Sequence, residues 1–158
     1  MIAKGIFISL EGIDGSGKST LIEYIQKSLT PKYKVISVRE PGGTYISEKI
    51  RKLLLDIKNE GIAPETQAIL YAAARAQLVE EIIKPALYDH NIVVADRFMD
   101  STIAYQGFGR GLDLMFLQEL NYLCTGGLKP DLTLLLEITP LMAQKRKKKD
   151  KPDRLEKE

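Results

Sequence analysis

A glycine-rich pattern near the N-terminus constrains this chain more than any other feature. Residues 12–19 read GIDGSGKS, which fits G-x-x-x-x-G-K-[ST] at every fixed position. An apolar, β-branched run at residues 6–10 precedes the pattern. Apolar residues follow it at helical spacing, at Leu21, Ile22, Ile25 and Leu29. Strand, glycine loop and helix therefore stand in the order that a phosphate-binding loop requires.

The chemistry of such a loop comes from its backbone. Glycines lack Cβ atoms, so successive N–H groups can converge on phosphate oxygens at the positive end of the following helix. We expect a nucleotide to contact Gly12, Ile13, Asp14, Gly15, Ser16, Gly17, Lys18, Ser19 and Thr20. Lys18 would reach the β- and γ-phosphates, and Ser19 Oγ would ligate Mg²⁺. The alternative, a glycine-rich turn with a surface lysine, leaves the flanking strand and helix unexplained.

Composition sets outer limits. With 158 residues, 44% of them hydrophobic, the chain can bury one substantial core, and we expect a single domain over residues 1–158. The net charge of +2 predicts no nucleic-acid partner, and a basic run at residues 145–151 is the exception. Cys124 and His90 are the only residues of their types, which excludes a disulfide framework and a Cys/His zinc site. Without a signal-peptide pattern or a long apolar run, we expect a cytoplasmic protein with no membrane association.

The rest of the chain alternates between strand and helix patterns. Apolar, β-branched runs predict further strands at residues 33–38, 92–96 and 132–138. Apolar residues at helical spacing predict helices at residues 46–54, 64–87 and 112–123. This alternation predicts an α/β fold, a three-layer α/β/α arrangement with a parallel sheet and helices on both of its faces.

Two of the helical segments carry further predictions. Pro64 opens the second helix, and Pro85 predicts a bend near its end. Its apolar face would be formed by Ile69, Leu70, Ala73, Ala76 and Leu78. Before the third helix, a loop is predicted by Gly107, Gly109 and Gly111.

Ligands of such sheets bind at the carboxyl ends of the strands. That rule brings residues 12–19, the turn-rich loop 39–44 and Asp96 around one crevice, although they are far apart in sequence. Asp96 ends an apolar run, where a carboxylate would hold Mg²⁺ directly or through water; the alternative is a simple strand terminus or helix cap. Arg97 follows it and would clamp a second phosphate, which suits a phosphoryl acceptor better than a water-activating NTPase.

At this point the sequence resembles the thymidylate kinase family of the nucleoside monophosphate kinases, which are P-loop NTPases. The resemblance is carried by four segments in the same order along the chain, residues 7–20, 39–44 (REPGGT), 96–107 (DRFMDSTIAYQG) and 130–133 (PDLT). It implies transfer of the γ-phosphoryl group of ATP to dTMP, giving dTDP and ADP in dTTP biosynthesis, with Mg²⁺ as the metal ion.

The resemblance also assigns roles to acceptor-site residues. Tyr71 stands where an aromatic ring stacks on thymine, and Arg75, one turn later, where a base carbonyl is bound. Tyr105 matches a ring that crowds the ribose 2′ position. Arg51 and Arg97 match the ligands of the acceptor phosphate. Without the resemblance, Tyr71 and Arg75 would be interpreted as a packing residue and a solvated charge.

Four further assignments follow from the same resemblance. Thr102 and Gln106 match positions that face the base. Glu40 and Asp14 match carboxylates near the acceptor and the metal. With Asp14 added to Ser19 and Asp96, the implied metal residues are Ser19, Asp96 and Asp14. Glu40 and Asp14 could equally be a helix cap or a surface charge.

The basic run indicates where a further catalytic cation comes from. One branch of the family has Arg at the position that Gly15 fills here, and the other branch supplies the cation from a mobile lid. We therefore expect a basic lid at about residues 140–154. The predicted catalytic residues are Lys18, Asp96, Arg97, Arg146, Lys149 and Arg154. The alternative is a solvated basic helix face without a catalytic role.

Other expectations concern the whole protein. Family members continue beyond the position of Glu158, so we expect their C-terminal strand and helices to be absent here. The family implies a homodimer built on helices, for which the mostly apolar segment 69–83 could serve, although core packing explains that segment as well. Two alternatives to dTMP kinase activity stay open: a kinase for another nucleotide or deoxynucleoside, and a non-catalytic, nucleotide-gated P-loop binding module.

Overall fold

The computed structural model describes residues 4–59 and 61–147. The strands found there form one parallel sheet in the order β2-β3-β1-β4. Their bounds are β1 (Ile6–Glu11), β2 (Val35–Arg39), β3 (Ile92–Asp96) and β4 (Leu132–Leu135). Asp96 at the end of β3 pairs with Leu10 of β1 and with Arg39 of β2, so the carboxyl ends of three strands are level.

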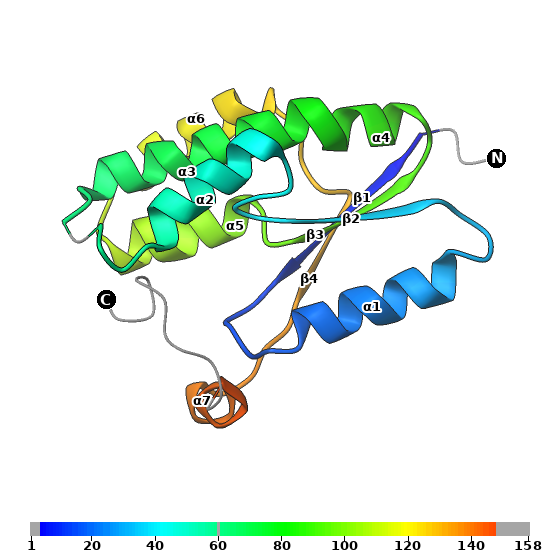
Figure 1. Ribbon diagram of the computed structural model, residues 1–158, viewed down its shortest axis with the longest axis horizontal. Helices are drawn as coiled ribbons and strands as arrows, with labels where there is room; N and C mark the ends of the chain where they lie inside the picture. Colours follow the sequence, from blue (N-terminus) through cyan, green and yellow to red (C-terminus); the bar gives the residue numbers. More distant parts are fainter. Residues whose placement is uncertain (1–3, 60, 148–158) are drawn as a thin grey trace.

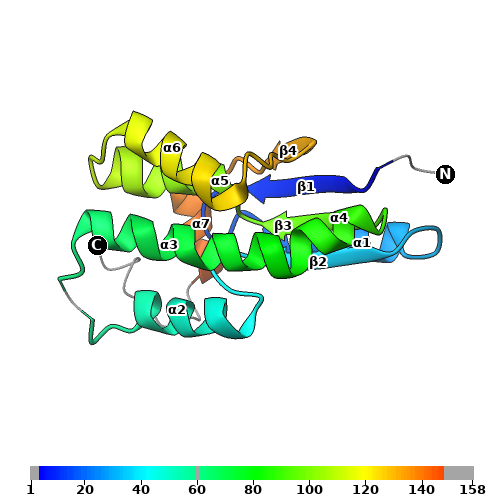
Figure 2. The same cartoon turned by 90° about the horizontal axis from the view of Figure 1, so that it is seen from above.

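Helices cover both faces of this sheet, as predicted. One face carries α1 (Lys18–Leu29). The other face carries the segments α2 (Tyr45–Leu55), α3 (Pro64–Leu78), α4 (Lys84–Tyr88), α5 (Met99–Thr102) and α6 (Leu114–Thr125) (Figures 1 and 2). Beside the carboxyl ends of the strands lies α7 (Pro140–Lys147) (Figure 1). No helix among the described residues is both long enough and apolar enough to cross a membrane.

The core lies on both faces of the central strands. Val93 and Ala95 face a buried cluster with α3 and α4, whereas Ile92 and Val94 face the cluster that includes α1. Because β3 is buried on both sides, its sequence is continuously apolar rather than alternating. Phe7 extends the first cluster toward the site, since its ring meets the edge of the Phe98 ring at a centroid distance of 4.9 Å.

The predicted apolar face of α3 is correct at Leu78 and wrong in most of its other positions. Ile69 is 51% exposed, and the buried apolar residues of this helix are Ala68, Ala72, Ala74 and Leu78. The buried stripe also includes Gln67 and Arg75, because α3 packs between α2 and α6 and uses polar contacts on that face. These two polar positions hide the helical period in the sequence.

The helical structure differs from the prediction in two places. A π-helical turn, η1 (Val79–Ile83), joins α3 to α4, so the irregularity begins before Pro85. Proline cannot donate the helical hydrogen bond, and a wider turn before it accommodates that loss. A second π-helical segment, η2 (Ile103–Gly109), replaces the predicted glycine loop up to Gly109. Gly107 is required there for packing, because a Cβ atom would lie 2.6 Å from Leu114 Cδ2.

The strand predicted at residues 132–138 is shorter in the structure. Among the described strands β4 pairs only with β1, and Glu11, the last residue of β1, pairs with Leu135. Pairing therefore ends where β1 ends. The residues after Leu135 leave the sheet and lead to α7 beside the glycine loop.

Candidate active site

The glycine loop leaves β1 and wraps around the side chain of Lys18. This side chain is buried, and its Nζ donates hydrogen bonds to the carbonyl oxygens of Gly12 at 2.9 Å and Ile13 at 3.2 Å. Burial lowers the pKa of Lys18, and the neighbouring Asp96 and Asp14 oppose that shift. Gly12 admits no side chain, because a Cβ atom would lie 2.6 Å from the carbonyl oxygen of Leu136. The backbone of the loop therefore surrounds the ammonium group of Lys18.

Asp96 lies at the carboxyl end of β3, next to this cation. Its Oδ1 is buried, lies 4.0 Å from Lys18 Nζ and has no hydrogen-bond partner among the described residues. Burial raises the pKa of the carboxyl group, while Lys18 and Arg97 act in the opposite direction. A buried carboxylate oxygen without a hydrogen-bond donor fits a metal ligand, since burial of a polar atom that makes no hydrogen bond is otherwise costly.

Arg97 has a left-handed backbone, with φ at 71°. Its own N–H donates to the carbonyl oxygen of Leu10 at 2.9 Å, which ties this turn to β1. The guanidinium donates from Nη2 to Asp14 Oδ1 at 2.6 Å and from Nη1 to Ser101 Oγ at 3.1 Å. It also lies 5.2 Å from the centroid of the Tyr105 ring. A strained conformation at a non-glycine residue is typical of functional sites.

Glu11 is a site residue that the sequence analysis missed. The side chain is buried at the end of β1, where Oε1 accepts from the Phe98 N–H at 2.7 Å and Oε2 accepts from Ser101 Oγ at 2.6 Å. Burial raises its pKa, and the hydrogen bonds from Ser101 and Phe98 oppose that shift. The available signal was an acidic residue directly before Gly12, at the end of an apolar strand.

A buried ion pair joins the loop after β2 to α3. Arg75 Nη2 lies 2.6 Å from Glu40 Oε2, and Arg75 Nε donates to the same oxygen at 2.7 Å. Arg75 also donates to Asn121 Oδ1 at 2.5 Å and to the carbonyl oxygen of Phe98 at 3.1 Å. Burial raises the pKa of Glu40, and Arg75 opposes that shift. Asn121 on α6 was also missed, because only the fold brings it to α3.

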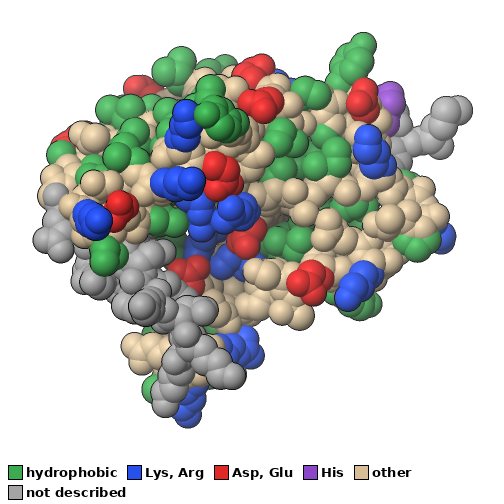
Figure 3. Space-filling view, in the orientation of Figure 1, with side chains coloured by type: hydrophobic (Ala, Val, Ile, Leu, Met, Phe, Trp, Pro, Cys, Tyr) green, Lys and Arg blue, Asp and Glu red, His purple; other side chains and the backbone are tan. Residues whose placement is uncertain are grey.

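Two neighbouring cavities open among these residues. The smaller cavity, of about 220 Å³, has walls that include every predicted acceptor-site residue, namely Glu40, Arg51, Tyr71, Arg75, Arg97, Thr102, Tyr105 and Gln106. The larger cavity, of about 980 Å³, is lined on the glycine-loop side by Asp14, Gly15, Gly17, Lys18, Ser19 and Thr20, and elsewhere by Asp96 and Arg146 among others. Figure 3 shows basic and acidic side chains gathered in a hollow of this face. The fold therefore brings the two predicted sites together.

Three loop residues lie outside both cavities. Gly12 and Ile13 line a third cavity, of about 430 Å³, next to α5 and the end of β4. Ser16 is buried, and its Oγ has no hydrogen-bond partner among the described residues. The predicted contacts of these residues with a nucleotide stay predictions.

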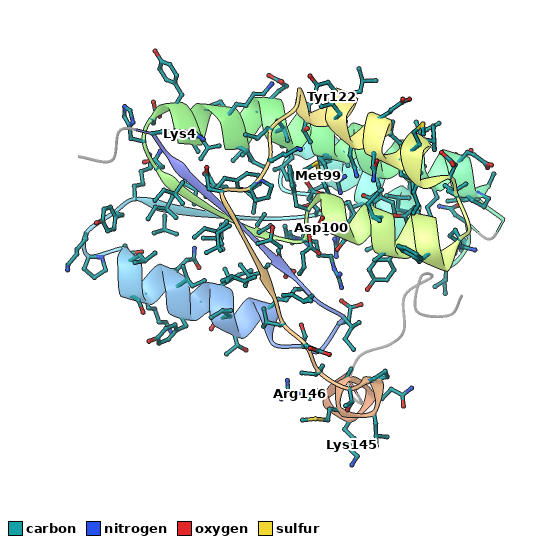
Figure 4. The ribbon with its side chains drawn as sticks, turned by 180° about the vertical axis from the view of Figure 1, so that it is seen from behind. Lys4, Met99, Asp100, Tyr122, Lys145 and Arg146 are labelled. Atoms are coloured by element: carbon teal, nitrogen blue, oxygen red, sulfur yellow. The ribbon has the colours of Figure 1, made fainter. Side chains whose placement is uncertain are left out.

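The predicted lid is described as far as Lys147. Arg146 on α7 donates from Nη1 to the carbonyl oxygen of Gly15 at 3.1 Å. Figure 4 shows Lys145 on the same helix pointing away from the body of the molecule. Lys149 and Arg154, the other two candidate cations, lie outside the described residues.

A phosphate-binding loop after the first strand, a carboxylate after a neighbouring strand and a second cavity lined by arginines define a P-loop kinase with an anionic acceptor. The family model described as thymidylate kinase matches residues 10–158. The chain belongs to the thymidylate kinase family.

Individual proteins support this assignment. The thymidylate kinase of Desulforudis audaxviator (strain MP104C) is 51% identical over 156 residues, an alignment that covers 98% of this chain and 71% of that protein. The thymidylate kinase of Thermoanaerobacter sp. (strain X514) is 49% identical over 156 residues, covering 98% of this chain and 76% of that protein. A crystal structure of thymidylate kinase from Ehrlichia chaffeensis matches with a TM-score of 0.80 and 39% identity, covering 90% of this chain and 76% of that one.

These matches confirm several predictions made from the sequence. The fold class, the family and the function as an ATP-dependent nucleoside monophosphate kinase are confirmed. They favour dTMP kinase activity over the kinase for another acceptor and over the non-catalytic binding module.

Proposed function

We propose that this chain transfers the γ-phosphoryl group of ATP to dTMP, with ATP in the larger cavity and dTMP in the smaller one. The observation that carries the proposal is a shared wall, since both cavities are lined by Asp14, Glu40, Arg51 and Arg97. Two nucleotides bound on either side of that wall would bring their phosphates together. Holding two reactants in this way supplies much of the rate enhancement of phosphoryl transfer.

The smaller cavity suits a pyrimidine deoxynucleotide. Tyr71 supplies a ring for stacking, while Thr102 and Gln106 are buried polar side chains on the cavity wall. Gln106 Nε2 donates to Gln67 Oε1 at 3.3 Å, which orients its amide group. Arg75 lines the same cavity, where it contacts a carbonyl group of the base. Tyr105 excludes a ribose 2′-hydroxyl.

Mg²⁺ is the proposed metal ion, and the residues present fit it. Asp96 offers a buried oxygen without a hydrogen-bond donor, and Ser19 and Asp14 line the same larger cavity. Among the described residues no group of three or more His, Cys, Asp or Glu side chains could hold a metal by itself. Mg²⁺ in kinase sites is usually held by one or two carboxylates together with substrate phosphates and water. When bound, it would neutralise negative charge on the β- and γ-phosphates.

The chain's own residues then need only to position and neutralise the reactants. The dTMP phosphate is already a nucleophile at neutral pH, so no general base is required. Lys18 leaves its carbonyl acceptors in the loop for the phosphates of ATP. Arg97 and Arg51 hold the acceptor phosphate in line. Arg146 supplies the cation that Gly15 does not provide, and Lys149 and Arg154 remain further candidates for that role.

We further propose a single kinase domain over residues 1–158 with a lid at about residues 140–154. The described part of this lid is α7, residues 140–147. The contact between Arg146 and Gly15 supports this assignment. A cytoplasmic location is proposed as well, because ATP and deoxynucleotides are cytoplasmic metabolites.

We propose a homodimer whose interface is formed by α6. Its outer face exposes three large side chains, Met115 at 68%, Tyr122 at 68% and Leu123 at 79%. Apolar patches of this kind are typical of interfaces. The segment 69–83 is a weaker candidate, since Leu78, Val79 and Ile83 are buried in the core. Leu123→Arg should shift the gel-filtration peak to the monomer, whereas Tyr88→Arg, at an exposed position on α4, should leave it unchanged.

The acceptor tests the proposed function most directly. We expect ATP-dependent turnover with dTMP to exceed turnover with dUMP by about 10- to 200-fold in kcat/KM, because one methyl group in a pocket discriminates by that amount. UMP, dCMP and thymidine should be poorer still. Lys18→Ala should abolish turnover while the circular dichroism spectrum stays that of the wild type. Equal rates with all five acceptors would contradict the assignment of dTMP.

A further inference from the structure

We propose that Glu11 is a positioning residue that orients the Arg97 guanidinium toward the acceptor phosphate through the hydroxyl group of Ser101. This inference rests on the proposed function, in which Arg97 holds that phosphate. It adds a residue from the end of β1 that lines neither of the two substrate cavities.

The direction of the hydrogen bonds is fixed by chemistry. Arg97 Nη1 lies 3.1 Å from Ser101 Oγ, and Ser101 Oγ lies 2.6 Å from Glu11 Oε2. A guanidinium only donates, a carboxylate only accepts, and a hydroxyl has one hydrogen to give. Ser101 must therefore accept from Arg97 and donate to Glu11. Glu11 thereby turns a lone pair of Ser101 toward Arg97.

The same carboxylate holds the backbone next to Arg97. Glu11 Oε1 accepts from the N–H of Phe98 at 2.7 Å, directly after the left-handed residue Arg97. Glu11 is buried, so both bonds are shielded from water and are charge-assisted. One carboxylate thus fixes the backbone that follows Arg97 and, through Ser101, one end of its side chain.

At its other end the guanidinium donates to a second carboxylate. Arg97 Nη2 lies 2.6 Å from Asp14 Oδ1, an atom of the glycine loop. Ser101 and Asp14 together hold the guanidinium between α5 and the glycine loop (Figure 4 labels Met99 and Asp100, the neighbours of Ser101 on α5). The group also lies at the smaller cavity, beside Tyr105. Its orientation there is therefore set by two acceptors of the protein and not by the substrate alone.

Glu11→Gln separates positioning from simple structural support, because the two side chains have the same shape. An amide has one oxygen and one NH₂ group, whereas both existing bonds need an acceptor. If the amide oxygen accepts from Phe98 N–H, the NH₂ group faces Ser101, and the Ser101 hydroxyl loses the carboxylate acceptor that orients it. If the amide is reversed, two donors face each other at Phe98. Either way the relay to Arg97 or its backbone support is lost.

The experiment compares steady-state constants of the full chain for the wild type, Glu11→Gln, Ser101→Ala and the double variant. Ser9→Ala is the matched control, since Ser9 is on β1 like Glu11, lines none of the cavities described above and loses a hydroxyl hydrogen bond of 2.9 Å to Thr133 on β4. We expect the dTMP KM to rise about tenfold in the Glu11→Gln and Ser101→Ala variants, because each loses one charge-assisted hydrogen bond. The ATP KM should stay unchanged. The double variant should be no worse than Glu11→Gln.

Three outcomes would overturn the proposal: an unchanged dTMP KM in Glu11→Gln, an equal rise in both KM values, or losses that multiply in the double variant. If Glu11→Gln does not fold, Ser101→Ala decides alone, because it leaves the bond from Glu11 to Phe98 intact. A wild-type chain that does not phosphorylate dTMP would instead reject the proposed function. The two failures are therefore distinguishable.

Discussion

Arg146 on α7 donates a hydrogen bond to the carbonyl oxygen of Gly15, at 3.1 Å and across 131 positions of sequence. The contact places a guanidinium against the glycine loop at the residue that has no side chain of its own. A cation of α7 therefore lies against the loop that holds Lys18.

Removal of that guanidinium should affect the chemical step. We expect Arg146→Ala to lower kcat by about 10³-fold, the lower range for a catalytic arginine in phosphoryl transfer. Arg146→Lys should recover part of the loss, since it keeps the charge but not the planar fork. Lys145→Ala is the control, because Lys145 is exposed and points away (Figure 4). Equal losses in the Ala variants of both residues would contradict a specific role for Arg146.

Gly15 is expected to be strained by any side chain. Its φ is +78°, and a Cβ atom would lie 3.1 Å from the carbonyl oxygen of Ala143 on α7. Gly61 has a similar φ of +84° with nothing within 4 Å of a Cβ atom, so Gly61→Ala measures the backbone strain alone, about 1 kcal/mol. Gly15→Ala should lose at least as much stability and should also raise the ATP KM. An unchanged ATP KM would show that α7 does not depend on close approach to the loop.

Asp96→Asn tests the metal assignment. The variant keeps the size of the side chain but removes the charge of the buried oxygen that lacks a donor. We expect a higher Mg²⁺ concentration for half-maximal activity and a lower kcat, while binding of dTMP without ATP or Mg²⁺ stays unchanged by calorimetry. A normal Mg²⁺ dependence would exclude Asp96 as the metal residue.

Asp131 predicts a pH dependence of stability away from the site. Its Oδ2 accepts from the Phe7 N–H at 2.9 Å, and Oδ1 lies 3.2 Å from Lys4 Nζ. The bond from Phe7 is the main reason that the pKa of Asp131 is lowered below 3.8. A lowered pKa in the folded state stabilises the protein above the ordinary pKa, and this stabilisation is lost as the pH falls through the folded value.

Asp131→Asn should therefore lower Tm at pH 7. The loss in the free energy of unfolding should be less than about 1 kcal/mol, because the side chain is partly exposed. The gap to the wild type should close as the pH falls below 3.8. Asp89→Asn, at an exposed position after α4, is the control in the same thermal melts. A gap of the same size at pH 3 and pH 7 would show that the charge of Asp131 contributes nothing.

The fold could be predicted where a single segment carries its own signal. The strand around Val94 is apolar throughout because both of its faces are buried, and Lys18 lies in a local pattern of eight positions. The buried face of α3 could not be predicted, since Gln67 and Arg75 occupy apolar positions of the helix period. Gly107 predicted a loop, although its lack of a side chain serves packing in a helix.

The site shows the same division. Asp96 and Arg97 were found because they follow a recognisable strand, whereas Tyr71 was singled out only through the resemblance to a family. Glu11 and Ser101 were missed because their hydrogen bond joins positions 90 residues apart. No local pattern encodes such a pair. The two residues meet only because β1 pairs with β3, which leads into α5 and Ser101.

A crystal structure of the chain with dTMP and a non-hydrolysable ATP analogue tests the central claim most directly. We expect the thymine ring against Tyr71 in the smaller cavity, the dTMP phosphate on Arg97 and the triphosphate along the glycine loop. A thymidine nucleotide bound elsewhere, with Tyr71 and Arg97 out of contact with it, would contradict the account.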